Sequence, residues 1–228
     1  DCIARGMDYN AGGARYNTTY IQGVGIGTVT DAFAALLAQV FDGGVSMDEL
    51  VAALDADFAG SEPLRQRLLN RSPKWGNDDE AADEVMRRVF GTFVDAIDGR
   101  PNGRGGTYGV DMLPTTCHVY FGSVTGAMPD GRKAGLPLSE GISPVQGADR
   151  HGPTAVLQSA SKMDHVRTGG TLLNMKFAPS LDTSTSTSAS SVAPAPPTKA
   201  ETRRSTWSGT LRSGTGKRST VASPGAKT

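Results

Sequence analysis

The sequence has 228 residues with balanced charge, 23 Lys and Arg residues against 23 Asp and Glu residues. A chain of this length can bury a sizeable core as one large domain or two small ones. Its two cysteines form no CxxC pair, it has no secretory signal, and no apolar run reaches the about 18 residues of a membrane span. These features exclude a disulfide scaffold and favour a cytoplasmic protein.

Glycines punctuate residues 8–27, and Gly23, Gly25 and Gly27 directly precede a helical pattern that ends at Gly43. The glycine spacing matches neither the dinucleotide fingerprint nor a Walker loop. We therefore interpret it as a tight strand-to-helix connection rather than a phosphate site. The apolar stripe of this helix is expected at Phe33, Leu36, Leu37, Val40 and Phe41.

Two further helices are predicted from their capping residues. Ser46 and Glu49 form a capping box for a helix that we expect to reach Phe58. Asn77 and Glu80 similarly precede the most amphipathic run of the chain. We interpret the apolar faces of both helices as parts of the core.

A β-branched and aromatic run at residues 117–121 predicts a buried strand, which leads into a long glycine-rich and proline-rich loop at residues 122–153. A loop of this length is uncommon in a compact domain unless it is functional or disordered. We expect it to be anchored on the core, either as a structural cover or as a ligand-contacting loop. The expected anchors are Val124, Met128, Leu136, Leu138, Ile142 and Val145.

After the loop, residues 154–167 have a moderate helical pattern and residues 171–177 read as a second strand, so this body is of the α/β class. At Asp182 the composition changes. The last 47 residues contain ten Ser, ten Thr and seven Lys or Arg residues, but few large apolar ones. We therefore divide the chain into a body at 1–181 and a disordered tail at 182–228. Because the change follows a strand directly, we interpret the tail as a frameshifted or misjoined reading frame.

Few residues have a pattern that points to catalysis. None of the three histidines has metal-ligand spacing, so no metal site is predicted. No sequence neighbour of Cys117 would activate its thiol, which favours a structural role over a nucleophile, and we identify no catalytic residue. The hydroxyls of Thr115 and Thr116 stand at the start of the predicted strand, where a substrate carboxylate or hydroxyl could be held.

Several segments of the body follow one another in a recognisable order: residues 10–17, 24–28, 76–79, 112–122, 129–132, 141–144, 152–155, 162–165 and 170–174. In this order they resemble the glycyl radical enzymes of the pyruvate formate-lyase-like superfamily. Residues 112–122 are more similar to the hydroxyproline and diol dehydratase branch than to true formate-lyases.

The resemblance implies a ten-stranded α/β barrel, usually a homodimer, of which residues 1–181 would form a part. It also implies a backbone glycyl radical in place of a bound cofactor, installed by a radical S-adenosylmethionine activating enzyme, and a cysteine at the barrel centre. The Gly-Cys-Val-Glu motif of that cysteine is expected before Asp1, inside a longer chain. The Arg-Val-Ala-Gly-Tyr radical segment is expected after residue 181, where the tail stands instead. A carboxylate-binding threonine is implied at Thr115 or Thr116.

We therefore expect an internal fragment of a glycyl radical lyase that eliminates water from a small hydroxylated substrate, such as hydroxyproline or a diol, and that is inactive by itself. One alternative is a fragment of a formate acetyltransferase-type lyase. Another is a non-catalytic piece that binds a partner and completes a split enzyme. Nucleic acid and membrane partners are not expected, because the basic tail lacks aromatic residues apart from Trp207.

Overall fold

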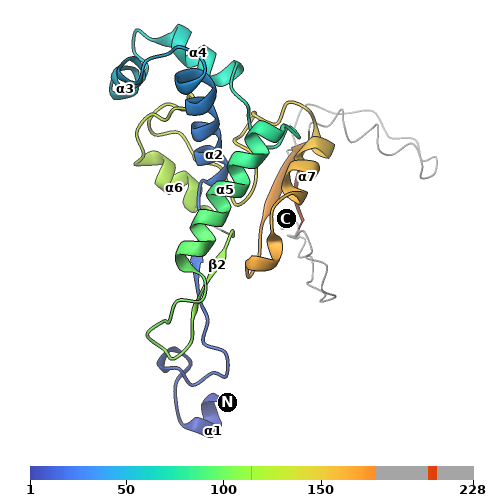
Figure 1. The fold of residues 1–228 in the computed structure, drawn as a ribbon. Helices are drawn as coiled ribbons and strands as arrows, with labels where there is room; N and C mark the ends of the chain where they lie inside the picture. Colours follow the sequence, from blue (N-terminus) through green and yellow to red (C-terminus); the bar gives the residue numbers. More distant parts are fainter. Residues whose placement is uncertain (114, 178–204, 210–228) are drawn as a thin grey trace, which may run out of the picture.

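A computed structural model describes residues 1–113, 115–177 and 205–209 of the chain. In Figure 1, helix α5 runs along the middle of the molecule, α2, α3 and α4 lie toward one end, and a slender N-terminal segment with α1 extends from the other. The elements are α1 (Cys2–Arg5), the 3-10 helix η1 (Tyr9–Ala11), β1 (Thr19–Gln22), α2 (Ile26–Ala35), the π-helix η2 (Leu36–Phe41), α3 (Met47–Asp55), α4 (Glu62–Asn70), α5 (Glu80–Ile97), β2 (Tyr108–Asp111), α6 (Cys117–Ser123), α7 (Pro153–Ser161), the 3-10 helix η3 (His165–Arg167), β3 (Leu173–Phe177) and β4 (Ser205–Gly209).

The strands form two short sheets. β1 and β2 pair in parallel, and β3 and β4 pair antiparallel. Met112, directly after β2, bridges in parallel to Thr171, so the segment that leads into β3 lies beside the end of β2. Parallel strands joined through helices confirm the α/β class. None of the helices that the structure describes is long and apolar enough to cross a membrane.

Helix α5 organises the larger core cluster, as its sequence pattern predicts. Met86, Phe90 and Val94 recur at helical spacing and are at most 3% exposed. They pack with Val110 of β2 and with Val156 of α7, among others. The cap of α5 differs from the prediction, because Asp79 rather than Asn77 accepts the hydrogen bond at the N-terminus, from the N–H of Ala81.

A second, smaller cluster packs under α3 and α4, around Leu50, Phe58 and Leu68. Ser46 caps α3 by accepting a hydrogen bond from the N–H of Glu49, as the capping box predicts. Helix α4, by contrast, is not among the elements that the sequence pattern predicts, because its alternating charges weaken its apolar pattern.

The expected stripe of the helix after Gly27 is wrong in part. Phe33, Leu37 and Phe41 are 43–69% exposed. The buried side of α2 instead carries small and polar residues: Thr30 contacts Met86 of α5, and Ala35 packs in the second core cluster. Small side chains allow the close approach of two helices, and the π-helix from Leu36 shifts the phase of the pattern by adding residues to each turn.

Residues 117–121 form part of helix α6 rather than the predicted buried strand. Short apolar runs do not distinguish the two structures by periodicity. One contact favours the helix: the guanidinium of Arg132 donates a hydrogen bond to the carbonyl of Gly122 at 2.6 Å, which satisfies a carbonyl of the last turn of α6. Val119 and Tyr120 are 49% and 67% exposed, so the run is not buried either.

Residues 124–152 contain neither helix nor strand, which confirms the long loop. Its middle is anchored as predicted, since Ile142 is fully buried and its carbonyl accepts a hydrogen bond from the indole of Trp75 at 2.8 Å. The expected anchors Val124 and Leu136 are wrong, because they are 70% and 47% exposed.

The predicted tail at 182–228 falls mostly outside the described residues. Residues 205–209 are the exception, since they form β4 and pair with β3. The division of the chain at Asp182 and the disorder of the tail stay predictions.

Candidate functional site

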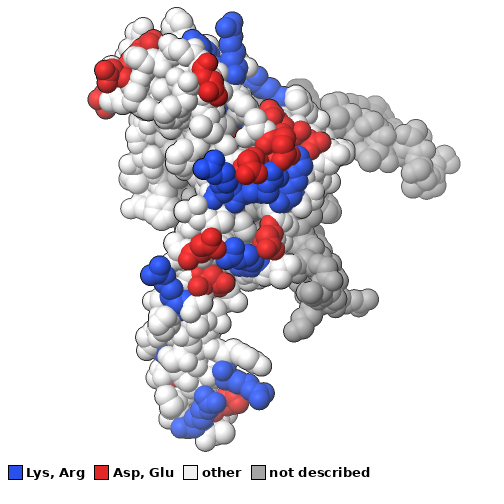
Figure 2. Space-filling view, in the orientation of Figure 1, with Lys and Arg blue, Asp and Glu red and all other residues white. Residues whose placement is uncertain are grey.

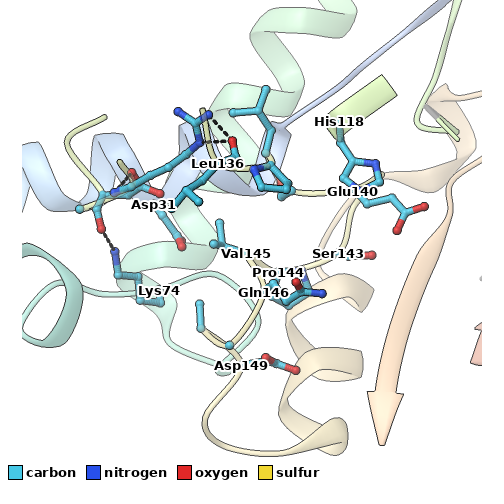
Figure 3. Close-up of a pocket in the computed structure, with 18 of the residues that line it drawn as sticks. Asp31, Lys74, His118, Leu136, Glu140, Ser143, Pro144, Val145, Gln146 and Asp149 are labelled. Atoms are coloured by element: carbon cyan, nitrogen blue, oxygen red, sulfur yellow. Dashed lines mark hydrogen bonds between the residues drawn. The ribbon is translucent and has the colours of Figure 1, made fainter. Parts of the chain in front are cut away.

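A pocket of about 750 Å³ lies between the long loop and helices α2 and α4. Figure 3 shows Asp31 and Lys74 on one side of this space and His118 and Glu140 on the other. Acidic and basic side chains contribute to the lining in similar numbers, so no sign of charge dominates, and apolar side chains of the long loop line the rest of the pocket.

Asp31 is a deeply buried carboxyl at one side of the pocket. It belongs to α2, is 1% exposed, and accepts a hydrogen bond from the N–H of Trp75 through Oδ1 at 2.8 Å. Its Oδ2 is buried and has no hydrogen-bond partner among the residues that the structure describes. Burial raises the pKa of Asp31 from 3.8 to about 7, although the charge of Lys74 and the Trp75 N–H oppose the rise.

Asp130 and Lys74 complete this end of the pocket. The ammonium of Lys74 donates to the backbone carbonyl of Asp130 at 2.9 Å, and Oδ1 of Asp130 accepts from the N–H of Arg132 at 3.0 Å. Burial raises the pKa of the Asp130 carboxyl, and Lys74 acts against this rise. Asp130 in turn raises the pKa of Asp31. Burial therefore favours the neutral form of both carboxyls, and the ammonium of Lys74 favours the charged form of both.

Arg132 holds the loop in shape rather than facing a ligand. Its guanidinium donates to the backbone carbonyls of Gly122 at 2.6 Å, Gly126 at 2.7 Å and Leu136 at 2.9 Å. Desolvation lowers the pKa of Arg132, and these carbonyls replace the lost water. The N–H groups of the Arg132 guanidinium are thus used in hydrogen bonds to backbone carbonyls of the loop and of the end of α6.

Thr115 and Thr116 lie outside this pocket, at the N-terminus of α6, and both are exposed. Thr115 has a φ of 51°, in the left-handed region that β-branched residues rarely adopt. Its carbonyl lies 3.1 Å from Nδ1 of His118, which does line the pocket. The structure therefore places the two threonines beside the pocket but does not join them to Asp31 and Lys74, and their binding role stays a prediction.

Asp31 and Lys74 line the candidate site, and sequence reasoning does not single them out. The only signal in the sequence is a carboxylate at Asp31 between small and apolar residues of a helix, on the face that proves to be buried. The partners that perturb it follow more than forty residues later, and no spacing rule connects them.

The remaining charged groups have structural roles or lie scattered over the surface. Lys162, at the end of α7, pairs with Asp78 at 2.8 Å and with the buried Asp83 of α5 at 2.5 Å, which ties the two helices together. On the face in Figure 2, basic and acidic side chains lie next to one another rather than in separate patches. Within the described ranges no group of three His, Cys, Asp or Glu residues could hold a metal ion.

Comparison with known families defines the class of this protein. The pyruvate formate lyase-like family model matches residues 1–122, and the glycine radical model matches residues 138–193. The chain therefore belongs to the pyruvate formate lyase-like family of glycyl radical enzymes, as the order of its sequence motifs predicts.

Its relatives include several dehydratases. Trans-4-hydroxy-L-proline dehydratase of Clostridioides difficile is 57% identical over 182 residues, which are 79% of this chain and 23% of that protein. The probable dehydratase YbiW of Escherichia coli is 41% identical over 189 residues, or 78% of this chain and 23% of the relative. Isethionate sulfite-lyase of Desulfovibrio desulfuricans is 42% identical over 168 residues, or 72% of this chain and 20% of the relative.

Comparison with solved structures finds members of the same family. Hydroxyproline dehydratase of Clostridioides difficile, with trans-4-hydroxy-L-proline bound, superposes with a TM-score of 0.76 at 57% identity over 79% of this chain and 23% of that one. The glycerol-bound B12-independent glycerol dehydratase of Clostridium butyricum has a TM-score of 0.72 at 40% identity, over 75% of this chain and 22% of that one. The chain thus spans less than a quarter of the length of these relatives.

Proposed function

We propose that this chain is part of a glycyl radical dehydratase that eliminates water from a small hydroxylated substrate, with trans-4-hydroxy-L-proline as the first candidate. The observation that carries the proposal is the 57% identity over 182 residues to a dehydratase of that substrate. Relatives that act on isethionate reach only 40–42% identity, so dehydration is favoured over cleavage of a carbon–sulfur bond.

Within such an enzyme, the chain would supply neighbouring strands and outer helices of a ten-stranded barrel. Two features support this role. β1 and β2 are parallel, and Tyr20 and Ile21 of β1 are 47% and 38% exposed although they belong to a sheet. A two-stranded parallel sheet buries too little surface to be stable alone, so further strands are expected to extend it in the complete enzyme.

The radical chemistry would come from other parts of the enzyme. The printed sequence contains neither a Gly-Cys-Val-Glu nor an Arg-Val-Ala-Gly-Tyr segment, and we propose that the chain alone is inactive. A radical S-adenosylmethionine activating enzyme is the expected partner, and the complete protein is expected to form a homodimer. Thr115 and Thr116, beside the end of β2, are proposed to contact the substrate carboxylate.

The test is an anaerobic assay of the complete gene product together with a radical S-adenosylmethionine activating enzyme. Trans-4-hydroxy-L-proline, glycerol, propane-1,2-diol and isethionate are offered separately, and mass spectrometry detects the loss of one water. We expect hydroxyproline to be dehydrated only when the activating enzyme is present. Consumption of isethionate alone, or of none of the four compounds, would refute the proposal.

The threonine assignment has its own control in the same assay. We expect Thr115→Val or Thr116→Val to raise KM for hydroxyproline about tenfold, because a hydrogen bond to a charged group is lost. Thr154→Val, at an exposed position of α7, is expected to leave KM unchanged. An unchanged KM in both of the first two variants would remove these residues from the site.

A further inference from the structure

Two polar side chains meet where the parallel strands β1 and β2 end. Gln22 is the last residue of β1, Asp111 is the last residue of β2, and the two are register partners. In sheets of parallel strands, ligands bind beyond the carboxyl ends of the strands. This pair therefore occupies the position in the sheet where a ligand site is expected.

The pair faces away from the core. Val110 and Met112, on either side of Asp111 in sequence, are 1% and 0% exposed and belong to the core cluster under α5. Because successive side chains of a strand point to opposite faces, Asp111 lies on the other face of the sheet. Tyr20, two residues before Gln22, lies on that same face and is 47% exposed.

Hydrogen bonds fix the orientation of both side chains. Nε2 of Gln22 donates to Oδ2 of Asp111 at 3.3 Å, and Oε1 of Gln22 accepts from the N–H of Leu113 at 3.0 Å. The bond to Leu113 thus fixes the side-chain amide of Gln22, and this amide in turn fixes the orientation of the Asp111 carboxylate. Such a preorganised group loses little entropy when it binds a ligand.

One oxygen of Asp111 remains unsatisfied. Oδ1 is buried, and no donor among the described residues meets hydrogen-bond geometry with it. Burial raises the pKa of this carboxyl, although Gln22 and the N–H of Gly170 oppose the rise. A buried polar atom without a partner is unusual in a native protein and requires an explanation.

The neighbouring backbone leaves room for this carboxylate. A Cβ atom on Gly169 would lie 2.5 Å from Oδ1 of Asp111 and 2.3 Å from the ring of Tyr20. Only a glycine therefore fits between the two side chains. The half-exposed ring of Tyr20 and Oδ1 of Asp111 thus both lie next to Gly169.

We propose that the carboxyl group of Asp111, oriented by Gln22 and bordered by Tyr20, binds the hydroxyl group of a small substrate at the carboxyl end of the β1–β2 sheet. The assignment rests on the proposed function and adds to it, because it names the group that distinguishes a hydroxylated substrate from its unhydroxylated analogue. A hydroxyl satisfies the free oxygen, whereas a methylene leaves it unpaired.

The experiment compares two ligands that differ only in this hydroxyl. Binding of trans-4-hydroxy-L-proline and of L-proline to the complete gene product, without its activating enzyme, is measured by NMR titration for the wild type, Asp111→Leu, Asp111→Asn and the control Asp42→Asn, which changes an exposed carboxylate elsewhere. We expect the wild type to bind the hydroxylated ligand about tenfold more tightly. Asp111→Leu is expected to abolish this preference and Asp42→Asn to keep it.

Asp111→Asn keeps the shape of the side chain and one acceptor oxygen, so it is expected to retain part of the preference for hydroxyproline over proline. This variant replaces Asp111→Leu in the experiment if the leucine variant does not fold. Equal affinity of the wild type for the two ligands, an unchanged preference in the Asp111 variants, or no binding of hydroxyproline up to about 10 mM would overturn the assignment. These outcomes are independent of the dehydration assay. Dehydration without the binding preference would leave the proposed function intact and exclude Asp111.

Discussion

Replacing Asp31 by asparagine tests the electrostatics of the pocket directly. In the wild type, Oδ1 accepts from the Trp75 N–H, Oδ2 has no partner among the described residues, and the group is 1% exposed. An asparagine at this position is neutral at every pH, and its amide oxygen can keep the bond to Trp75. The substitution therefore removes the cost of a buried charge while conserving shape.

The magnitude follows from the pKa of Asp31, which is raised from 3.8 to about 7 in the folded protein. Because the folded state holds the proton more tightly, the stability that the neutral form provides is fully present below about pH 4 and is lost as the pH rises to about 7. The shift corresponds to a loss of about 4 kcal/mol in the free energy of unfolding over this range. Above about pH 7 the loss is constant.

The assay is urea unfolding of the wild type and of Asp31→Asn between about pH 4 and pH 9. We expect the variant to be the less stable protein at the acid end, since its amide leaves a buried N–H₂ unpaired, and to gain about 4 kcal/mol relative to the wild type by about pH 8. Asp42→Asn, at an exposed position, should give a flat difference. A flat difference for Asp31→Asn as well would refute the buried-charge reasoning.

Two further substitutions test the packing of the loop. Gly76 has a φ of 89°, and a Cβ there would lie 2.2 Å from the ring of Pro144, so Gly76→Ala should lower the free energy of unfolding by about 3 kcal/mol or more. Gly91 lies in open space within α5, so Gly91→Ala should raise the free energy of unfolding by about 0.5–1 kcal/mol. Equal effects of the two substitutions in urea unfolding would contradict the packing of Gly76 on Pro144. A lysine at position 132 cannot reach several carbonyls at once, so Arg132→Lys should lower the free energy of unfolding by about 2–3 kcal/mol and speed amide hydrogen exchange at residues 124–136. Unchanged exchange would show that the guanidinium does not hold the loop.

The helices were predictable where local pattern and burial agree. In α5 the apolar residues keep one face along the whole helix, and Met86, Phe90 and Val94 all reach the core. Ser46 fixes the start of α3 through a bond to Glu49, one turn further along the chain. A capping bond and an apolar face both depend on residues that lie within about one helical turn of each other, so both can be predicted from the sequence alone.

The strands and the pocket depend on contacts that local pattern does not contain. β2 has the sequence Tyr-Gly-Val-Asp and only one large buried side chain, Val110, so it resembles a loop until β1 pairs with it. Helix α6 depends on Arg132, which lies beyond its C-terminus in the long loop. The perturbation of Asp31 requires Trp75 and Lys74 from another part of the chain. Family resemblance predicted the class of protein, but not which of its polar groups are buried.

The central claim is that residues 1–181 are one part of a glycyl radical dehydratase. The most direct measurement is the sequence of the genomic DNA upstream of the Asp1 codon and across the codons for Leu181 and Asp182. We expect a segment encoding Gly-Cys-Val-Glu upstream and one encoding Arg-Val-Ala-Gly-Tyr downstream, in frames that join to the body of the chain. Absence of both segments from the locus would contradict it, because no route to a glycyl radical enzyme would then remain for this gene.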